Sequence, residues 1–281
     1  MTTWLITGAS SGLGAALARA VLEHGDNAAV TARDTDRVRD LVDAHPDRAL
    51  ALPLDVTVHD QVVAVVETAT ERFGAVDVLV NNAGHGYRAA VEEAAADEVD
   101  ELFATNFFGP VDLTKQVLPQ MRARGSGTVV NVSSIAAPRS NPGSGYYTAT
   151  KAALEGMSDA LNREVAPLGI RVMVIEPGAF RTDFAGRSLT QSRTAIEDYA
   201  DTAGKRRKEN DRTHGTQQGD PDRAARVIVD AVKADRAPFR LLLGTDAVKI
   251  VRDEFQGRID EIDAWAPVSV TTDFAGEANA G

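Results

Sequence analysis

The stretch TWLITGASSGLG, residues 3–14, decides the fold class of this chain. Its first five residues form a compact apolar run that is typical of a buried strand, and glycines follow at positions 8, 12 and 14. Helical spacing begins within the turn, because Leu13, Leu17 and Val21 recur every fourth residue. The stretch therefore predicts a strand, a glycine turn and a helix in direct succession.

A glycine turn in this position favours a dinucleotide-binding site. Glycine permits a tight turn, lets the backbone approach a phosphate closely and allows a helix to pack closely on a strand. The free N–H groups and the positive end of the helix can then face a pyrophosphate. An ordinary glycine-rich turn is the alternative, but the place after the first strand of a βαβ unit favours the nucleotide. We expect the cofactor to contact Gly8, Ser10, Ser11, Gly12, Leu13 and Gly14.

Short apolar runs alternate with longer segments of helical period along the rest of the chain. Near-continuous apolar strands are typical of a parallel sheet that is covered on both faces. Right-handed crossovers make such a sheet doubly wound, and the glycine turn favours this α/β architecture over a barrel with the same alternation. We expect one domain, with strands at 3–7, 27–32, 49–54, 76–81, 128–132, 170–175 and 239–243, and helices at 36–44, 62–73, 98–124 and 147–165.

Composition excludes several classes of function. The 281 residues are 43% hydrophobic, which excludes wholesale disorder, and the net charge of -11 argues against a nucleic-acid-binding surface. There is no cysteine, so disulfides and thiol catalysis are impossible, and the five histidines lack metal-ligand spacing. No apolar run is long enough to span a membrane, and the N-terminus does not resemble a signal peptide. We therefore expect a cytoplasmic protein without a metal centre.

The end of the second predicted strand indicates which dinucleotide binds. NAD sites place an acidic residue here, which accepts a hydrogen bond from the ribose 2′-OH. This chain has the small Ala32 followed by Arg33, whose guanidinium can pair with a 2′-phosphate. A solvated arginine at a helix start is the alternative, and Asp34 complicates the local charge. The pattern favours NADP(H) over NAD(H).

Tyr147 and Lys151 are the strongest candidates for the reacting groups. They are four residues apart in a helical segment and so share one face. A tyrosine has an ordinary pKa of about 10, and a nearby ammonium lowers it by about 1–3 units. That shift would bring proton exchange with an alcohol or a carbonyl oxygen near neutral pH. Tyr146 is five residues from the lysine, which makes Tyr147 the better candidate.

Two strand ends supply further candidates. Ser134 follows the predicted strand 128–132 closely, and ligands in open α/β sheets bind beyond the carboxyl ends of strands. Its hydroxyl can donate a hydrogen bond to a reacting oxygen. The run NNAG at 81–84 closes another strand in the same way, although asparagine and glycine also form ordinary turns.

Five motifs occur in one order in this chain: TGASSGLG at 7–14, NNAG at 81–84, Ser134, YTATK at 147–151 and PGAFRT at 177–182. Together they resemble the short-chain dehydrogenase/reductase family over about residues 3–245. The resemblance implies a Rossmann-type seven-stranded sheet with strand order 3-2-1-4-5-6-7. It also implies an enzyme that acts on a small molecule and forms a homodimer or homotetramer.

The resemblance further implies a role for individual residues. Tyr147 is then the proton donor or acceptor, Lys151 binds the nicotinamide ribose and lowers the pKa of the tyrosine, and Ser134 orients the carbonyl. Asn106 completes a proton relay through water. The remaining cofactor contacts that we expect are Asp55 and Val56 near the adenine, Asn82, Ala83 and Gly84 along the cofactor, and Pro177, Gly178, Phe180 and Thr182 at the carboxamide.

The substrate pocket is expected beneath residues 181–219, a long polar stretch that is typical of a mobile lid. Its apolar walls favour a hydrophobic ketone, aldehyde or alcohol, although core packing is the alternative role for each aromatic residue. The basic run 205–208 is either a solvated helix face or a guide for an anionic or acyl-carrier substrate. The expected substrate contacts are Ser134, Tyr147, Ile135, His85, Tyr87 and Phe184.

The chain thus divides into a catalytic domain at 1–244, a helical extension at 245–268 and a loose tail at 269–281. The extension can pack on the sheet, cover the pocket or meet a neighbouring subunit. Two other functions stay open: a 3-oxoacyl-thioester reductase, and a redox sensor that binds NADP without turnover. The presence of Ser134, Tyr147 and Lys151 favours an enzyme.

Overall fold

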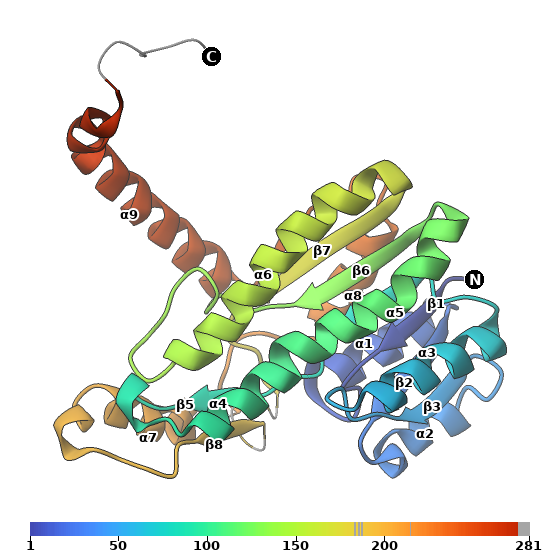
Figure 1. Cartoon of the computed structure of the whole chain (residues 1–281). Helices are drawn as coiled ribbons and strands as arrows, with labels where there is room; N and C mark the ends of the chain where they lie inside the picture. The colour runs from blue at the N-terminus through green and yellow to red at the C-terminus, as the bar shows by residue number, and fades with distance from the viewer. Residues whose placement is uncertain (183, 185, 187, 214, 275–281) are drawn as a thin grey trace.

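The computed structural model describes residues 1–182, 184, 186, 188–213 and 215–274. A parallel seven-stranded sheet forms its centre, with strand order β3-β2-β1-β4-β6-β7-β9 (Figure 1). This is the order 3-2-1-4-5-6-7 along the sheet, so the predicted doubly wound fold is confirmed and a closed barrel is excluded. The strands are β1 (Thr3–Ile6), β2 (Asn27–Ala32), β3 (Ala49–Pro53), β4 (Val78–Asn81), β6 (Gly127–Val132), β7 (Ile170–Pro177) and β9 (Arg240–Leu243).

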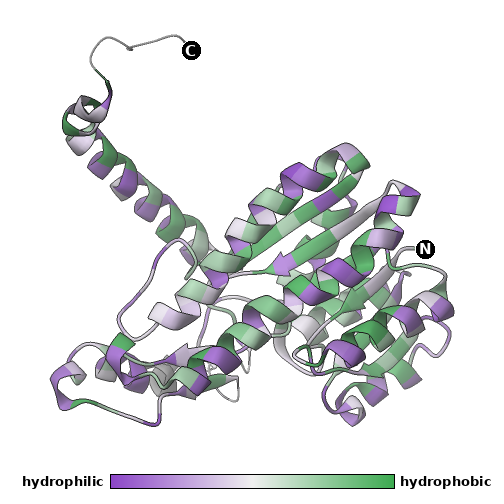
Figure 2. Cartoon of the chain, in the orientation of Figure 1, coloured by the Kyte–Doolittle hydropathy of each residue, from purple (hydrophilic) through white to green (hydrophobic). Residues whose placement is uncertain are grey.

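Helices cover both faces of the sheet. On one face α1 and α8 pack together over a core that includes Leu17 and Ile228, both fully buried. On the other face α3, α5 and α6 enclose a second core around Leu113. Figure 2 shows the hydrophobic strands between these helices. The helices are α1 (Gly12–Glu23), α2 (Arg39–Asp43), α3 (His59–Phe73), α4 (Ala96–Phe103), α5 (Gly109–Arg124), α6 (Gly145–Val165), α7 (Ala203–Thr213), α8 (Pro221–Lys233) and α9 (Thr245–Ser269).

The predicted helix at 98–124 is divided in the structure. A π-helical turn, Ala104–Phe108, separates α4 from α5. A β-carbon on Gly109, the first residue of α5, would lie 2.9 Å from Val56, so the chain passes close to the loop after β3 here. Such a turn inserts a residue without ending the helix, which is why the apolar spacing did not reveal it.

Other elements lie outside the predicted pattern. The helix α8 was missed, although its apolar side chains are deeply buried against α1. Two short strands, β5 (Gly86–Arg88) and β8 (Leu189–Gln191), pair in parallel away from the main sheet. They join α4 and α7 in a small lobe at the carboxyl end of the sheet (Figure 1).

The helix α9 projects from the body of the molecule (Figure 1). It extends one residue beyond the predicted helical extension, and a 3-10 turn, Val270–Thr272, follows it. Part of the predicted tail is therefore helical, and residues 275–281 lie outside the described part of the chain. No helix in the described residues combines the length and apolar character needed to cross a bilayer.

Candidate active site

A cavity of about 820 Å³ opens at the carboxyl ends of the parallel strands. It brings together the glycine turn, the ends of β2, β4 and β6, the start of α6 and the loop after β7. Twenty of the residues predicted as site residues line it, from Gly8 at one end to Tyr147 and Thr182 at the other. Four do not: Gly14, Tyr87, Asn106 and Ile135.

The glycine turn is fixed by close contacts with the loop after β4. Gly8 has a φ of +66°, and a β-carbon there would lie 2.9 Å from the Cα atom of Ala83. The Asn82 side-chain amide donates hydrogen bonds to the carbonyl oxygens of Thr7 and Gly8, at 2.8 and 3.2 Å. The Thr7 hydroxyl accepts from the backbone N–H groups of Asn82 and Ala83. The two loops therefore form one rigid wall of the cavity.

Gly14 has a different role from the one that we expected. It does not line the cavity, and a β-carbon there would lie 2.4 Å from the Gly8 carbonyl oxygen and 2.5 Å from the Asn82 amide nitrogen. The third glycine therefore allows α1 to pack closely on the turn behind the wall, as it does in dinucleotide-binding turns. Its assignment as a direct cofactor contact is corrected to a packing position.

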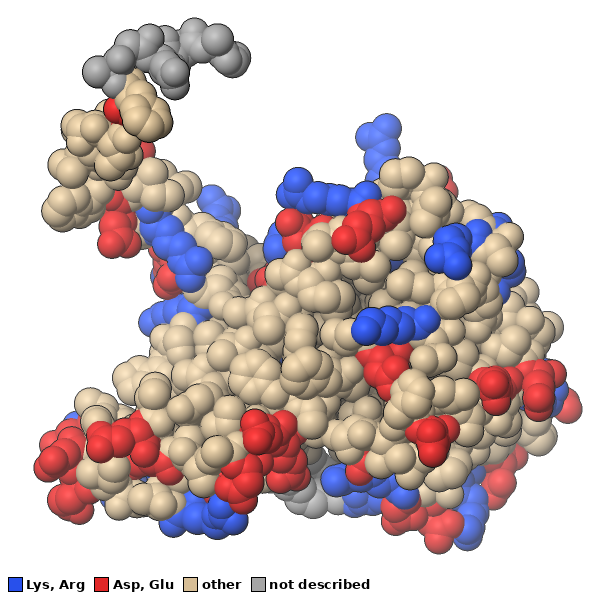
Figure 3. All heavy atoms as spheres, in the orientation of Figure 1, with Lys and Arg blue, Asp and Glu red and all other residues tan. Residues whose placement is uncertain are grey.

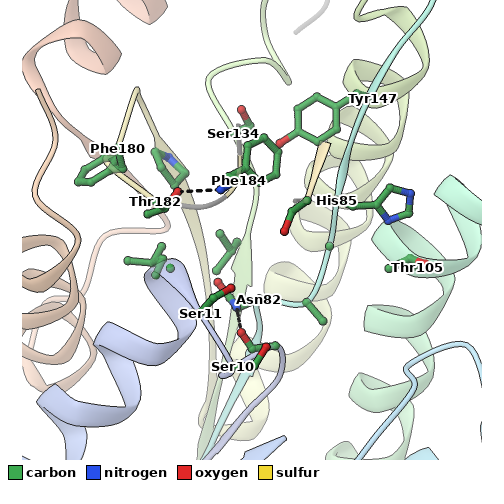
Figure 4. A pocket seen from close by; sticks show the side chains of 18 of the residues that line it. Ser10, Ser11, Asn82, His85, Thr105, Ser134, Tyr147, Phe180, Thr182 and Phe184 are labelled. Carbon is green, nitrogen blue, oxygen red and sulfur yellow. Dashed lines mark hydrogen bonds between the residues drawn. The ribbon is translucent and has the colours of Figure 1, made fainter. Parts of the chain in front are cut away.

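The N-terminus of α1 opens into the cavity and fits a diphosphate. Ser11 is the N-cap, but its side chain makes no capping hydrogen bond to the helix. The first N–H groups of a helix lack partners within the helix and carry partial positive charge. Ser10, Ser11, Gly12 and Leu13 all line the cavity at this point, and Figure 4 shows the two serines below Asn82.

The far end of the cavity has the polar groups that an adenosine needs. Arg33 is exposed beside the buried Ala32, and both line the cavity. Burial raises the pKa of Asp55, but hydrogen bonds from Thr57 and the charge of Arg33 outweigh it and hold the pKa below its ordinary value. Asp55 is therefore an anion that can accept hydrogen bonds, and Val56 beside it adds apolar surface.

Ser134, Tyr147 and Lys151 meet in the cavity, as the sequence predicted. The hydroxyls of Ser134 and Tyr147 both lie near the ring of Phe184 (Figure 4). Tyr147 and Lys151 are nearly fully buried in the first turns of α6, and the lysine nitrogen lies 6.0 Å from the centre of the tyrosine ring. The helix therefore presents both side chains on the face that closes the cavity.

The expected lowering of the tyrosine pKa is wrong for this arrangement. Burial raises the pKa of Tyr147 above its ordinary value, and the neighbouring Ser134 hydroxyl and the charge of Arg88 only partly oppose the shift. Desolvation disfavours the phenolate, and this effect outweighs the nearby charges. The hydroxyl is therefore protonated at neutral pH.

Burial also shifts the pKa of Lys151, in the opposite direction. Burial lowers the pKa of its ammonium to about 8, and the negative charge of Glu155, one helical turn further on, opposes the shift. Its Nζ atom donates a hydrogen bond to the carbonyl oxygen of Val132, at 2.8 Å. This bond fixes the ammonium between the end of β6 and the tyrosine.

Asn106 is fully buried in the π-helical turn and does not line the cavity. Its side-chain oxygen accepts from the His85 N–H at 3.0 Å, and its amide donates to the His85 carbonyl at 2.9 Å and to the Thr150 hydroxyl at 3.3 Å. A β-carbon on Gly84 would lie 3.0 Å from the Asn106 oxygen and 3.7 Å from Lys151 Nζ. Asn106 therefore holds the loop after β4 against α6, and its predicted relay role stays untested.

The predicted substrate walls divide into two groups. His85 and Phe184 line the cavity, and the rings of Phe184 and Tyr147 lie 5.9 Å apart. Burial lowers the pKa of His85, so its imidazole is neutral at neutral pH. Tyr87 lies in a separate core instead, where its hydroxyl donates to Glu98 at 2.7 Å, and burial together with this bond raises its pKa to about 12. Ile135 does not line the cavity either, so both predictions are corrected.

The loop after β7 joins the two ends of the cavity. Pro177, Gly178, Phe180 and Thr182 all line it, and a β-carbon on Gly12 would lie 3.3 Å from Thr182. The Asp246 carboxylate, at the start of α9, accepts from the Ala179 N–H at 2.7 Å and lies against Gly178. The first turn of α9 therefore fixes the loop from behind.

Several lining residues were not predicted. Glu101 and Thr105 are four apart in the helical region before Asn106 and share the face that meets the cavity, a spacing that was visible in the sequence. Others come from the polar stretch 184–219, which has no local signal for a wall. The residues in question are Thr31, Leu54, Thr57, Glu101, Thr105, Val132, Ser133, Ala179, Ser188, Thr190, Arg206, Thr216 and Gln217.

Comparison with known proteins identifies the family. A family profile described as short chain dehydrogenase matches residues 2–193, which is more than half of the chain. The chain belongs to the short-chain dehydrogenase family. It is therefore an oxidoreductase by family, and its glycine turn and its Tyr147–Lys151 pair both lie within the matched region.

Relatives of this short-chain dehydrogenase extend over nearly its whole length. Oxidoreductase BOA17 from Botryotinia fuckeliana is 36% identical, with 96% of this chain and 98% of the relative covered. A 3-ketodihydrosphingosine reductase from Bacteroides thetaiotaomicron is 37% identical, with 85% and 87% covered.

Solved structures agree with the fold of the chain. A short-chain dehydrogenase from Streptomyces avermitilis is 44% identical, with a TM-score of 0.91, 97% of this chain and 100% of that one covered. An alcohol dehydrogenase from Thermococcus sibiricus, complexed with 5-hydroxy-NADP, is 29% identical, with a TM-score of 0.70 and coverage of 86% and 96%.

Within the described residues no group of three or more histidine, aspartate or glutamate side chains could hold a metal ion.

Proposed function

We propose that this protein is an NADP(H)-dependent oxidoreductase that interconverts a hydrophobic ketone or aldehyde and the corresponding alcohol. The observation that carries the proposal is the convergence of the Ser134 and Tyr147 hydroxyls in the cavity that the glycine turn also lines. A carbonyl oxygen placed between these hydroxyls would accept hydrogen bonds from both.

A bound nicotinamide dinucleotide supplies or accepts the hydride in this reaction. The protein residues orient the reacting groups and move the proton. Tyr147 donates its proton to the carbonyl oxygen during reduction and takes it back during oxidation. Ser134 donates a hydrogen bond to the same oxygen, and Lys151 places its positive charge beside the phenol, where it stabilises the phenolate that proton donation leaves.

The ionisation state of Tyr147 favours the reductive direction at neutral pH. Burial raises its pKa, so the proton is present when a carbonyl substrate binds. Reduction should therefore proceed at neutral pH and decline as pH rises through the pKa of the phenol. Oxidation needs the phenolate and should increase over the same range.

Arg33 supports the preference for NADP(H). It is exposed at the end of β2, beside the buried Ala32 and within the cavity lining, so that its guanidinium can approach a phosphate on the adenosine ribose. Asp55 is also anionic here, but it lies after β3 and not at the end of β2 beside Arg33.

The cavity wall supports a hydrophobic substrate. The ring of Phe184 lies 5.9 Å from that of Tyr147 and near the reacting hydroxyls, and His85 is neutral. One relative is named a 3-ketodihydrosphingosine reductase, so its name also specifies a keto substrate. A 3-oxoacyl thioester is the second candidate, because Arg206 of the basic run 205–208 lines the cavity. Lys205 and Arg207 pair with Asp201 and Glu93 instead.

The decisive experiment follows NADPH absorbance with a panel of hydrophobic ketones, aldehydes and 3-oxoacyl thioesters. Tyr147→Phe should lower turnover by about 10²–10⁴-fold and leave NADPH affinity nearly unchanged, because it removes only the transferred proton. Tyr146→Phe is the matched control, since that hydroxyl donates to the Val91 carbonyl at the surface. Near-normal turnover in Tyr147→Phe would contradict the proposal.

The same panel separates the remaining alternatives. Activity that is confined to thioesters, and that falls when Arg206 is replaced by Met, would favour the acyl reductase. NADPH binding without turnover of any substrate would favour a redox sensor.

A further inference from the structure

A buried charged cluster lies behind the cavity and takes no part in the proton transfer proposed for the site. It consists of Glu155 on α6, Glu176 on β7 and Arg240 at the start of β9. The side chains of Glu176 and Glu155 are 2% and 13% exposed, whereas the charged side chains in Figure 3 are spread over the surface. A carboxylate that is removed from water must be compensated by hydrogen bonds or by opposite charge, so the partners of this cluster indicate its role.

Glu155 and Lys151 attach α6 to the end of β6 at two neighbouring residues. The Lys151 ammonium donates to the Val132 carbonyl oxygen at 2.8 Å, and the Ser133 hydroxyl donates to Glu155 Oε1 at 2.6 Å. The two helical residues are one turn apart and share one face of α6. Ser134 is the next residue of the chain after this double attachment. Glu155 therefore helps to fix the position of Ser134, on the strand end, relative to Lys151 on the helix.

Glu155 carries the negative charge of the cluster, and Glu176 carries a proton below pH 7. The distance of 2.6 Å from the Ser133 hydroxyl is typical of a hydrogen bond to an ionised carboxylate. Arg240 Nε lies 3.4 Å from Glu155 Oε2 and 3.7 Å from Glu176 Oε1, so one guanidinium faces both carboxyl groups. Glu176 Oε1 is buried and accepts no hydrogen bond from the described residues. Burial and the charge of Glu155 raise the pKa of Glu176 to about 7, against the opposing charge of Arg240.

The other titratable groups that surround Lys151 in the described part of the chain leave the compensation of its charge to Glu155. A phenol on the same face of α6 is protonated at neutral pH and an imidazole after β4 is neutral, because burial raises the pKa of the first and lowers the pKa of the second. A carboxylate on α4 acts on that imidazole, and guanidinium groups on β5 and β9 are positive. In this order the groups are Tyr147, His85, Glu101, Arg88 and Arg240.

We propose that Glu155 is a positioning residue, whose carboxylate keeps Lys151 in the ammonium form and holds the end of β6 against α6. A nearby opposite charge favours the charged form of a lysine, and here it opposes the lowering of the Lys151 pKa by burial. Lys151 needs its positive charge in order to stabilise the phenolate that Tyr147 leaves after proton donation. The effect of Glu155 on turnover rests on the proposed function, whereas its effect on Lys151 does not.

Glu155→Gln separates the charge of this residue from its hydrogen bond. The glutamine side-chain oxygen can still accept from the Ser133 hydroxyl, so the variant loses the charge and keeps the attachment to β6. Chemical unfolding of the wild type, Lys151→Met, Glu155→Gln and the double variant at several pH values gives the coupling free energy between positions 151 and 155. Glu164→Gln replaces Glu155→Gln in a matched control cycle, because Glu164 is exposed near the end of the same helix.

The coupling should be favourable and largest below about pH 7, and it should disappear as pH rises above 8. Only the ammonium form of Lys151 interacts with the carboxylate, and loss of that charge should lower the lysine pKa from about 8 by about one unit. The same cycle in a Glu176→Gln background fixes the neutral form of that carboxyl and keeps its titration near pH 7 out of the measurement. Absence of coupling below pH 7, a coupling that persists unchanged above pH 8, or an equal coupling in the control cycle would overturn the proposal.

The pH profile of turnover gives a second readout, which a purely structural role of Glu155 would not move. With a ketone that the NADPH panel identifies, the alkaline decline of kcat that follows loss of the Lys151 proton should begin about one pH unit lower in Glu155→Gln. Glu155→Asp restores the charge and should return the decline towards that of the wild type. An unchanged profile in Glu155→Gln would refute the effect on turnover. Absence of turnover in the wild type would contradict the proposed function alone, and the unfolding cycle would still decide whether Glu155 maintains the charge of Lys151.

Discussion

The cavity has an inner and an outer wall that are built in different ways. The inner wall consists of the glycine turn, the ends of β4 and β6 and the first turns of α6, and backbone atoms in direct contact hold it, as between Gly8 and Ala83. The outer wall comes from the described residues of 184–219, and side-chain charges hold it to the small lobe, as between Arg207 and Glu93.

This difference suits the two walls to different ligands. Backbone contacts tolerate no change in size, so they suit a wall that holds a constant cofactor. Charge pairs at the end of long side chains allow the sequence and shape of the outer wall to vary, which suits a wall that faces the substrate. Substitutions in the outer wall should therefore change substrate binding and leave cofactor binding unchanged. Substitutions in the inner wall should change cofactor binding.

The largest effect on stability is expected at the outer wall, for Arg207→Met. The Glu93 carboxylate is 2% exposed and lies 2.6 Å from the guanidinium of Arg207, which also donates to the Thr194 carbonyl at 2.9 Å. Removing one member of a buried ion pair leaves an uncompensated charge and costs about 3–5 kcal/mol. We expect the lobe to open locally and KM for the ketone to rise, with the dissociation constant of NADPH unchanged.

Hydrogen exchange of residues 188–213 and steady-state kinetics test this prediction. Lys205→Met is the control, because Lys205 pairs with Asp201 across an exposed turn of the same segment. An exposed pair of this kind contributes about 0–1 kcal/mol. A rise in KM of equal size in both variants would refute the specific role of the buried pair.

The next effect is expected at the inner wall, for Gly14→Ala. The added β-carbon would lie 2.4 Å from the Gly8 carbonyl oxygen and would displace the Asn82 amide. Overpacking of this kind costs about 1–3 kcal/mol, and the turn that faces the diphosphate should shift with it. NADPH affinity should fall by about 5–150-fold, which is that free energy expressed as a binding constant.

Gly156→Ala provides the matched control for this variant. Gly156 lies within α6, and no atom is within 4 Å of the position that its β-carbon would take. Alanine is favoured over glycine in a helix by up to about 1 kcal/mol, so this variant should be slightly more stable than the wild type. Calorimetry of the two variants should therefore move in opposite directions, and NADPH titration should change only for Gly14→Ala.

The inner wall could be predicted from the sequence because its determinants are local. The glycines at 8, 12 and 14 follow directly on β1, and Tyr147 and Lys151 are one helical turn apart, so spacing alone places them. The direction of the tyrosine pKa could not be predicted, because it depends on how deeply α6 buries the hydroxyl. Burial is a property of the folded chain and is not visible in the spacing of two residues.

The outer wall could not be predicted because its determinants are distant in sequence. Tyr87 follows the NNAG motif closely, yet Glu98 and the lobe hold it away from the cavity. Glu93 and Arg207 pair across 114 residues, and neither lies in a motif that predicts the contact. The helix α8 is a different case. It was also missed, but its determinants are local, because Asp220 caps it and its apolar spacing is regular.

Lys151→Met should show that the buried charge at the inner wall lowers the stability of the wild-type protein. Burial lowers the pKa of this ammonium from 10.5 to about 8. Below pH 8 the folded protein therefore keeps a buried charge at a cost, and the methionine variant should be more stable although inactive. Between pH 8 and 10.5 the unfolded chain binds the proton and the folded one does not, so the stability of the wild type rises with pH.

The difference in the free energy of unfolding between Lys151→Met and the wild type should accordingly be largest below pH 8. Between pH 8 and 10.5 this difference should shrink by about 1.4 kcal/mol for each pH unit, as linkage requires. Chemical unfolding at several pH values measures this gap, with Lys249→Met on the exposed surface of α9 as the control. A gap that is independent of pH would show that the lysine is not titrating in the folded state.

The smallest effect is expected at the rim of the inner wall, for Arg33→Ala. Backbone contacts hold much of this wall in place, but Arg33 is an exposed side chain and resembles the outer wall in this respect. A charge-assisted hydrogen bond to a ribose phosphate contributes about 1.5–3 kcal/mol, and solvent reduces the value at an exposed site. The ratio of kcat/KM for NADPH over NADH should therefore fall by about tenfold, whereas kcat with saturating NADPH should hardly change. Arg37→Ala, one turn further from the cavity, should leave the ratio as it is. An unchanged ratio in Arg33→Ala would mean that the backbone and serine groups of the glycine turn select the dinucleotide, and that the exposed arginine at the rim has no part in the selection.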